Sequence, residues 1–352
     1  MKLADARIGY AGYSRDFSAP GDRRRFAVYA RERGLTYEQA RIDQPYDVVL
    51  ITHHSDLPAW IARKRLEGDR LKLLFELIDS YLADRSPMRR LLKGVGRSVV
   101  GTDSRLSLDF LKALKAACHA ADAVICATPE QQREIRELND NVHLSFDWFG
   151  DELRDSKTDY RRSRKLRLVW EGQSTTLSHL RVIREQLNEL ADGVELHVVT
   201  DAQIRRYHGW LRYPTKRLLQ GFRCETHLHE WRRNSFSRHI TDADVAIIPI
   251  DASDEFAMGK PENKLVMLWK LGMPVLTAAT PAYRRAMDAA GLDLTCADRS
   301  EWRTQLRRML DAPPSELQSI AEQGRAFAER SYSKAEFLQR FADVFRSVGF
   351  ED

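Results

Sequence analysis

The sequence contains few cysteines and no long apolar run. Its 352 residues include only Cys118, Cys126, Cys224 and Cys296, which are far apart and form no CxxC pair. This spacing argues against a disulfide framework or a zinc motif and fits a reducing cytosol. The N-terminus lacks the apolar stretch of a signal peptide, and no run approaches the about 20 residues that span a bilayer. We therefore expect a cytoplasmic protein, either soluble or peripheral at the inner face of the cell membrane.

Two common phosphate-binding motifs are also missing. The first turn, GYAGYSRD, is not GxGxxG, so nicotinamide chemistry has little support. No GxxxxGK[ST] occurs either, because Gly259-Lys260 is followed by proline. A nucleic-acid interface is disfavoured because the basic residues are spread out and are not interleaved with aromatic residues.

The remaining composition is that of a soluble globular protein. Hydrophobic residues make up 43% of the chain and charged residues 30%, and the length favours two domains. The formal charge of +5 and the isoelectric point near 9.0 suit an anionic ligand or an anionic membrane surface. Solvated basic faces produce the same values, so net charge alone does not decide between these interpretations.

Short apolar runs alternate with amphipathic segments along the whole chain, which predicts an α/β fold. Continuous Val/Ile/Leu runs are typical of buried parallel strands. Strands are expected at 6–13, 46–54, 71–79, 121–128 and 142–146, and again at 166–172, 194–201, 225–231, 243–250, 273–279 and 292–297. Helical patterns include 26–34, 104–120, 129–138, 315–331 and 333–347.

The polar, highly charged segment 151–165 has the composition of a linker between two domains. The two halves also share a pattern: HAADAVICATPEQQREI (119–135) and ITDADVAIIPI (240–250) both place an Ala-Asp pair before a buried strand. Two doubly wound, Rossmann-like domains are the simplest architecture, with domain ranges 1–150 and 166–332. Ligands bind beyond the carboxyl ends of strands in such sheets, so we expect the site in a cleft between the domains.

A candidate phosphate site lies at the front of the predicted helix 263–271, which Gly272 ends. The first turn of a helix presents free backbone N–H groups and the positive end of the helix dipole. Lys260, Asn263 and Lys264 add side-chain donors there, which suits phosphate or pyrophosphate. The alternative is an ordinary capped surface helix.

The same residues carry a resemblance to a known family. NKLVMLWKLGMPV (263–275) resembles the donor-site helix of family-4-type GT-B glycosyltransferases, which typically reads K-L-x-E-x-x-A-x-G-x-P-V. ADAVICATPEQQREI (121–135) resembles a second segment of that family. The resemblance implies an acceptor-side domain at 1–150, a nucleotide-sugar donor domain at 166–332, and a C-terminal helix in 333–352 that crosses back to the first domain.

Three positions differ from the family pattern. The glutamate that usually binds the donor ribose falls on Met267, and its companion acidic residue falls on Gly259. Glu262 or Glu255, which lie nearby, would then contact the ribose. An arginine of the family corresponds roughly to Gln173. These differences indicate a divergent enzyme, retaining or inverting, or a noncatalytic relative.

An inverting enzyme also needs a general base near the acceptor hydroxyl. Candidates follow expected strands of the first domain: Asp16 after the first turn, His53 and His54 after 46–54, and Asp79 at the end of 71–79. We prefer Asp79 and His54, because titratable groups at three neighbouring strand ends favour a shared site. For each residue alone, the alternative is a cap, a turn or a core hydrogen bond.

No metal and no cofactor are expected. His227 and His229 would share a strand face, but no carboxylate or third histidine at fixed spacing supports a metal site, and a core or cleft-lining role is the preferred interpretation. Asp242-Ala-Asp244 matches the DxD metal motif of other glycosyltransferases. It precedes a strand rather than following one, so we interpret it as a helix-to-strand turn.

Residues 85–101 have the pattern of a basic amphipathic helix, which is typical of an interfacial membrane anchor. A helix packed on its own domain with a solvated basic face is the alternative. The apolar stripe and the basic stripe consist of Met88, Leu91, Leu92, Val95 and Val99, and of Arg85, Arg89, Lys93 and Arg97.

Together, the motifs and the resemblance imply a glycosyltransferase of polysaccharide or glycoconjugate synthesis. It would move a sugar from a nucleotide-sugar donor to a glycan or a lipid-linked acceptor. A noncatalytic GT-B-like binding or scaffold subunit and a sugar-nucleotide epimerase are the alternatives.

Overall fold

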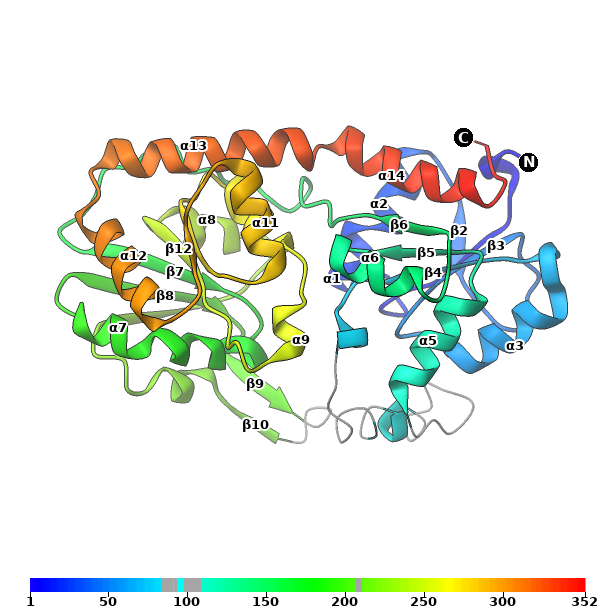
Figure 1. The fold of residues 1–352 in the computed structure, drawn as a ribbon, viewed down its shortest axis with the longest axis horizontal. Coiled ribbons are helices and arrows are strands. Elements are labelled where there is room, and N and C mark those ends of the chain that lie inside the picture. Colours follow the sequence, from blue (N-terminus) through cyan, green and yellow to red (C-terminus); the bar gives the residue numbers. More distant parts are fainter. Residues whose placement is uncertain (84–90, 92–93, 98–108, 207–210, 352) are drawn as a thin grey trace. The chain divides into compact units, whose positions relative to one another are not determined.

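The computed structural model describes residues 1–83, 91, 94–97, 109–206 and 211–351. The chain forms two compact units (Figure 1), each built on a six-stranded parallel sheet. The predicted fold class, two Rossmann-like α/β units, is therefore confirmed. The first unit comprises Met1–Trp148, Gly259–Pro261 and Lys334–Asp352, and the second comprises Phe149–Met258 and Glu262–Ser333.

The sheet of the first unit has the strand order β2-β1-β3-β4-β5-β6. Strands β3, β4 and β5 are almost completely buried because helices cover both faces, which explains their continuous apolar sequences. The sequence analysis missed β2, an edge strand with only one aromatic residue and two exposed polar residues. The strands are β1 (Ile8–Ala11), β2 (Tyr37–Gln39), β3 (Val48–Thr52), β4 (Lys72–Leu77), β5 (Ala123–Cys126) and β6 (Val142–Leu144).

Helices α3 and α5 pack against each other on one side of this sheet, and α2 and α14 lie on the other (Figure 1). Helix α14 belongs to the first unit because Phe341 and Phe345 stack on the buried ring of Tyr29, with ring centroids 5.4 and 5.6 Å away. The helices of this unit are α1 (Pro20–Arg24), α2 (Phe26–Glu32), α3 (Leu57–Glu67), α5 (Phe110–Ala120), α6 (Pro129–Arg136) and α14 (Lys334–Ser347).

The sheet of the second unit has the order β11-β8-β7-β12-β13-β14, and all neighbouring strands are parallel. Its strands are β7 (Leu166–Glu171), β8 (Val194–Thr200), β11 (Glu225–Glu230), β12 (Val245–Ile248), β13 (Val275–Ala278) and β14 (Thr295–Cys296). A separate antiparallel pair, β9 (Gln203–Arg206) and β10 (Leu211–Pro214), was not expected. The helices are α7 (Arg184–Glu189), α8 (Phe236–Thr241), α9 (Glu255–Met258), α10 (Asn263–Lys270), α11 (Pro281–Ala290), α12 (Arg299–Asp311) and α13 (Pro314–Ser331).

The charged segment 151–165 packs on the second unit, although its composition is that of a linker. The ammonium group of Lys157 is buried and donates to the carbonyl oxygen of Ala243 at 2.7 Å. Burial lowers the pKa of Lys157. The hydroxyl of Tyr160 donates to the carbonyl oxygen of Gly272 at 2.9 Å. A polar segment can therefore be ordered by hydrogen bonds to backbone carbonyls that a composition argument does not reveal.

All four cysteines are buried, free thiols. Burial raises the pKa of Cys118, Cys126 and Cys296 to about 12, and it also raises the pKa of Cys224. These thiols therefore stay protonated at neutral pH and are poor nucleophiles or metal ligands. Within the described residues, no helix combines the length and apolar character that crossing a membrane requires.

Helix α10 is held by α13 through a close contact at Gly324. The Trp269 side chain is fully buried, and a Cβ atom on Gly324 would overlap Cδ1 of the Trp269 ring and lie 2.9 Å from Cγ. Phe327 packs edge-on against the same ring at 5.8 Å. Because Trp269 lies on α10, this contact fixes the position of the helix whose first turn was predicted to bind phosphate.

We expect Gly324→Ala to lower the free energy of unfolding by about 1–3 kcal/mol, because the added methyl group must displace a buried indole. This outcome has the opposite sign to helix propensity, which favours alanine over glycine by about 1 kcal/mol. Urea denaturation would measure it, with Ser319→Ala on the exposed face of α13 as the matched control. A stabilised Gly324→Ala protein would contradict the tight packing.

Candidate functional site

The strand order of the second unit reverses between β7 and β12. Strand β7 comes first in this sheet's sequence, with β8 and β11 on one side and β12, β13 and β14 on the other. In doubly wound sheets, ligands bind outside the carboxyl ends of the strands at such a switch point. Helix α10 connects β12 to β13, so its N-terminus lies at this edge of the sheet.

Lys264, in the first turn of α10, reaches the end of β7. Its ammonium group donates to the carbonyl oxygen of Glu171, lies 3.9 Å from the Glu171 carboxylate and sits over the Trp170 ring at 5.2 Å from the centroid. A Cβ atom on Gly172 would lie 2.8 Å from this ammonium group, so the glycine leaves room for the contact. The structure thus places a cation at the switch point.

Glu262 precedes α10 and is buried, with 7% of its surface exposed. Its carboxylate makes no capping hydrogen bond to the helix. It accepts instead from Nη2 of Arg285 at 3.1 and 3.2 Å and from the hydroxyl of Tyr332 at 2.7 Å. The first N–H groups of α10 therefore receive no side-chain cap from this residue, and Glu262 is held by two partners inside the unit.

The other donor-side candidates belong to the second unit, apart from Lys260. Gln173 directly follows Gly172 and is exposed, and Glu255 is exposed at the start of α9, in the connection between β12 and α10. Asn263 begins α10 beside Lys264, whereas Lys260 is grouped with the first unit. Met267, at the position of the family's glutamate, is only 3% exposed.

The first unit has its own switch point, between β1 and β3. Hydroxyl groups of Thr52 and Ser55 both donate to the carbonyl oxygen of Ala11, at 3.2 and 2.9 Å, and so join the carboxyl ends of these strands. His54 lies two residues beyond the end of β3, and its ring lies 5.6 Å from the ring of Tyr13, which lies two residues beyond the end of β1. One of the two preferred base candidates is therefore at the switch point.

Asp79 follows β4, the neighbouring strand, and its negative charge acts on His54. The pKa of His54 is lowered. The main cause is partial desolvation of the ring, although the residue as a whole is exposed. The positive charge of Arg97 adds to this effect. The charges of Asp22 and Asp79 oppose it. The result is a neutral imidazole at pH 7, the protonation state that a general base requires.

Asp16, the weaker candidate, is engaged in a local turn. Its carboxylate accepts from the backbone N–H and the hydroxyl of Ser18, at 3.2 and 2.7 Å. These hydrogen bonds lower the pKa of Asp16, which suits a structural turn better than a proton acceptor.

The sequence analysis missed a buried charge network beside this switch point. Arg25 and Glu76 are fully buried and form an ion pair at 2.6 Å, and Arg25 also lies 3.2 Å from Asp147. The Tyr13 hydroxyl donates to Glu76 at 3.0 Å, and its backbone N–H donates to buried Asp22 at 2.7 Å. The one available signal was a glutamate inside the otherwise apolar run LKLLFELID.

The sequence analysis found no third histidine or carboxylate to support a metal site at His227 and His229. In the structure, the neighbouring strand β8 supplies both: His197 is the registered partner of His227, and Glu195 lies two residues earlier on the same face. The expectation that no metal binds stays a prediction, and its argument considered spacing within one strand only.

Most of the predicted amphipathic helix 85–101 lies outside the described residues. Among those described, Leu91 is 40% exposed, and the guanidinium group of Arg97 donates to the carbonyl oxygens of His53 and Ser55. Arg97 thus contacts the loop that carries His54. The membrane contact stays a prediction.

Comparison with known proteins identifies the fold. No protein-family model and no curated protein sequence matches the chain. Among solved structures, HepE from Anabaena in complex with UDP and glucose matches over 97% of this chain and 100% of its own, with a TM-score of 0.64 and 12% identity. Sucrose-phosphate synthase from Thermosynechococcus elongatus matches over 92% of this chain and 76% of its own, with a TM-score of 0.57 and 13% identity.

A third match is TarM from S. aureus, in complex with fondaparinux, α-GlcNAc-glycerol and UDP. It covers 85% of this chain and 55% of TarM, with a TM-score of 0.56 and 8% identity. The chain therefore has the GT-B fold, as the resemblance of its donor-site helix implied. At these identities, the comparisons show a common fold and no residue-level correspondence.

Proposed function

We propose that this protein is a glycosyltransferase that moves a sugar from a nucleotide-sugar donor to a glycan or lipid-linked acceptor. The observation that carries the proposal is Lys264 at the switch point of the second unit, at the start of α10. HepE and TarM, which share the fold, were solved with UDP bound. The proposal places the reaction in polysaccharide or glycoconjugate synthesis, in the cytoplasm or at the inner membrane face.

The donor diphosphate is assigned to the first turn of α10. The N–H groups of a first helical turn and the helix dipole stabilise negative charge there, and Lys264, Asn263 and Lys260 add donors. The same groups would stabilise the charge that develops on the departing nucleotide. Lys264 already has a counter-ion in Glu171, so a bound phosphate would compete with this carboxylate for the ammonium group.

The ribose contact is assigned to Glu255 rather than Glu262. Both oxygens of Glu262 are already held by Arg285, and one also accepts from Tyr332. Glu255 is exposed at the start of α9. Gln173, on the loop after β7, is placed at the base or the sugar of the donor.

His54 is assigned as the group that accepts the proton of the acceptor hydroxyl, with Asp79 adjusting its pKa through its charge. Both residues follow neighbouring strands of the first unit. A noncatalytic GT-B-like subunit is the second candidate function. It is favoured by Met267, which is buried where the resembling family has a ribose-binding glutamate.

A thermal-shift screen with UDP, GDP, dTDP, CMP and ADP tests the donor site. One nucleotide is expected to stabilise the protein, by about 2.7 kcal/mol at a concentration of 100 times its Kd. Lys264→Ala is expected to weaken that binding about 10- to 150-fold, because a charged hydrogen bond contributes about 1.5–3 kcal/mol. Arg284→Ala removes the same charge from an exposed position of α11 and serves as the control.

Two outcomes would count against this assignment. A nucleotide that binds the wild-type and Lys264→Ala proteins equally would remove Lys264 from the donor site. If none of the five nucleotides stabilises the wild-type protein, the donor-site argument fails and the noncatalytic function becomes the better explanation.

A further inference from the structure

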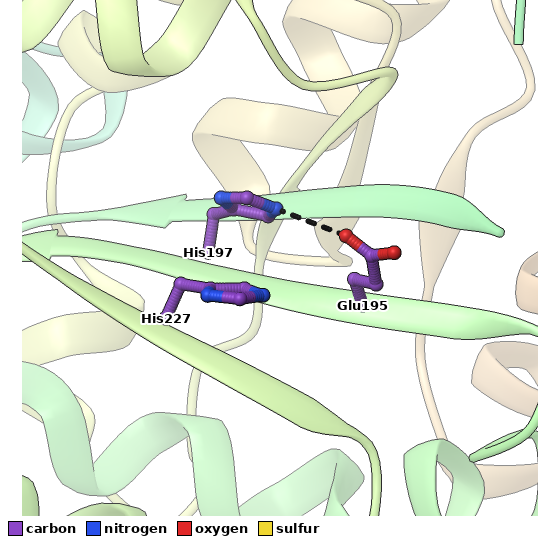
Figure 2. A group of neighbouring side chains, drawn as sticks. All are labelled: Glu195, His197 and His227. Atoms are coloured by element: carbon purple, nitrogen blue, oxygen red, sulfur yellow. Dashed lines mark ion pairs between the residues drawn. The ribbon is translucent and has the colours of Figure 1, made fainter. Parts of the chain in front are cut away.

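Four histidines lie together between the sheet of the second unit and α8. His197 on β8 stacks on His227 of β11 with ring centroids 4.8 Å apart, and on His229 at 5.2 Å. His239 of α8 stacks on His229 at 4.5 Å. Figure 2 shows His197 and His227 one above the other, both beside Glu195. These residues lie along the strands rather than at the carboxyl edge, so the cluster is separate from the proposed donor site.

Two of these histidines, His197 and His227, form with Glu195 a group that has the chemistry and spacing of a metal site. One ligand atom each from Glu195, His197 and His227 lies within 4.8 Å of the other two. The Glu195 carboxylate is 3.6 Å from Nε2 of His197. A tetrahedral zinc ion with bonds of about 2.0–2.1 Å places its ligand atoms about 3.3 Å apart, so small side-chain rotations would close the site.

The second ring nitrogen of His197 fixes its orientation. Nδ1 of His197 lies 3.0 Å from Nε2 of His229, which leaves Nε2 of His197 directed at Glu195. Metal-binding histidines are commonly held in this way by a hydrogen bond to the ring nitrogen that does not bind the metal.

Among the residues that the structure describes, none forms a hydrogen bond with Nε2 of His197, which is a buried polar atom. Buried polar atoms are nearly always paired, and an orphaned one calls for an explanation such as a bound ion. The Glu195 carboxylate does not serve as this partner, because its distance of 3.6 Å from Nε2 of His197 is longer than a hydrogen bond. A cation between the carboxylate and the two imidazoles would satisfy this nitrogen.

We propose that Glu195, His197 and His227 bind one divalent transition-metal ion of the zinc class. Two imidazoles and a carboxylate suit zinc, and three protein ligands leave the fourth position for water. The ion would join β11, the last strand at this edge of the sheet, to β8. The bound metal would thus stabilise the pairing of these two strands within the second unit and take no part in the transfer reaction.

Zinc titration of the tag-free, chelator-treated full chain against a chromophoric zinc indicator tests the site. We expect one zinc ion per chain, and a Tm that rises with zinc by mass action. Replacement by Co²⁺ should give the visible absorption of a tetrahedral complex. Glu195→Gln, His197→Gln and His227→Gln should each weaken zinc binding more than about tenfold.

His239→Gln is the matched control, because His239 stacks in the cluster but is not one of the three ligands. Its zinc affinity should stay within about twofold of wild type. His227 is 38% exposed, so His227→Gln is the variant best suited to keep the fold, which the Tm of the metal-free protein would verify. Substoichiometric binding, or binding that none of the three substitutions weakens, would overturn the proposal and indicate an adventitious ion only.

Discussion

Arg25→Ala is expected to lower the free energy of unfolding by about 3–5 kcal/mol, because it leaves buried carboxylates without their cation. Arg25 and Glu76 have no exposed side-chain surface, and Asp147 is 13% exposed. The pKa of Glu76 is raised, mainly by burial, and Arg25 is the main cause that opposes this effect. Without Arg25, Glu76 must therefore take up a proton or remain an unpaired charge in the core.

Urea denaturation would measure this loss, with the two units followed separately because they can unfold in different transitions. Arg41→Ala is the matched control: its ion pair with Asp43 is 68% and 58% exposed, and such pairs contribute about 0–1 kcal/mol. The double variant Arg25→Met, Glu76→Gln should recover part of the loss, since it removes both buried charges. A loss below about 1 kcal/mol in Arg25→Ala would show that water reaches the network.

The sequence predicts those buried elements whose own residues form a recognisable apolar run. Strands β3, β4 and β5 are buried and mostly apolar, with Glu76 of β4 as the buried charged exception, so their runs were recognised without the structure. Edge strand β2 and helix α3 were missed. Strand β2 has exposed polar residues, and α3 carries charged residues on much of its surface. Their positions depend on tertiary packing, which local sequence patterns do not encode.

In the candidate sites too, some groupings of residues can be predicted from the sequence, whereas others depend on tertiary packing. His54 and Asp79 could be grouped in advance because the carboxyl ends of parallel strands share one edge of a sheet. The pairing of Arg25 with Glu76, 51 residues away, could not. The partnership of His197 with His227 depends on the register between β8 and β11, and a shift of one residue would place one of the two rings on the other face. Register is a property of the folded sheet.

His54→Ala is expected to lower kcat about 10²- to 10⁴-fold, the usual contribution of a general base. Nucleotide binding should remain, because the proposed donor residues Lys264 and Asn263 belong to the second unit. Release of the nucleoside diphosphate from the donor that the thermal-shift screen selects would measure turnover. Equal losses of nucleotide affinity and turnover would instead indicate a structural role for His54.

The pH dependence separates a base from a structural histidine. Because the pKa of His54 is lowered from 6.5, the fall of kcat/KM on the acid side should lie below pH 6.5. The positive charge of Arg97 lowers this pKa and the negative charge of Asp79 raises it. Arg97→Gln should therefore move the acid limb to higher pH and Asp79→Asn to lower pH. If the acid limb moves in the same direction in both variants, or moves in neither variant, another group controls the proton transfer.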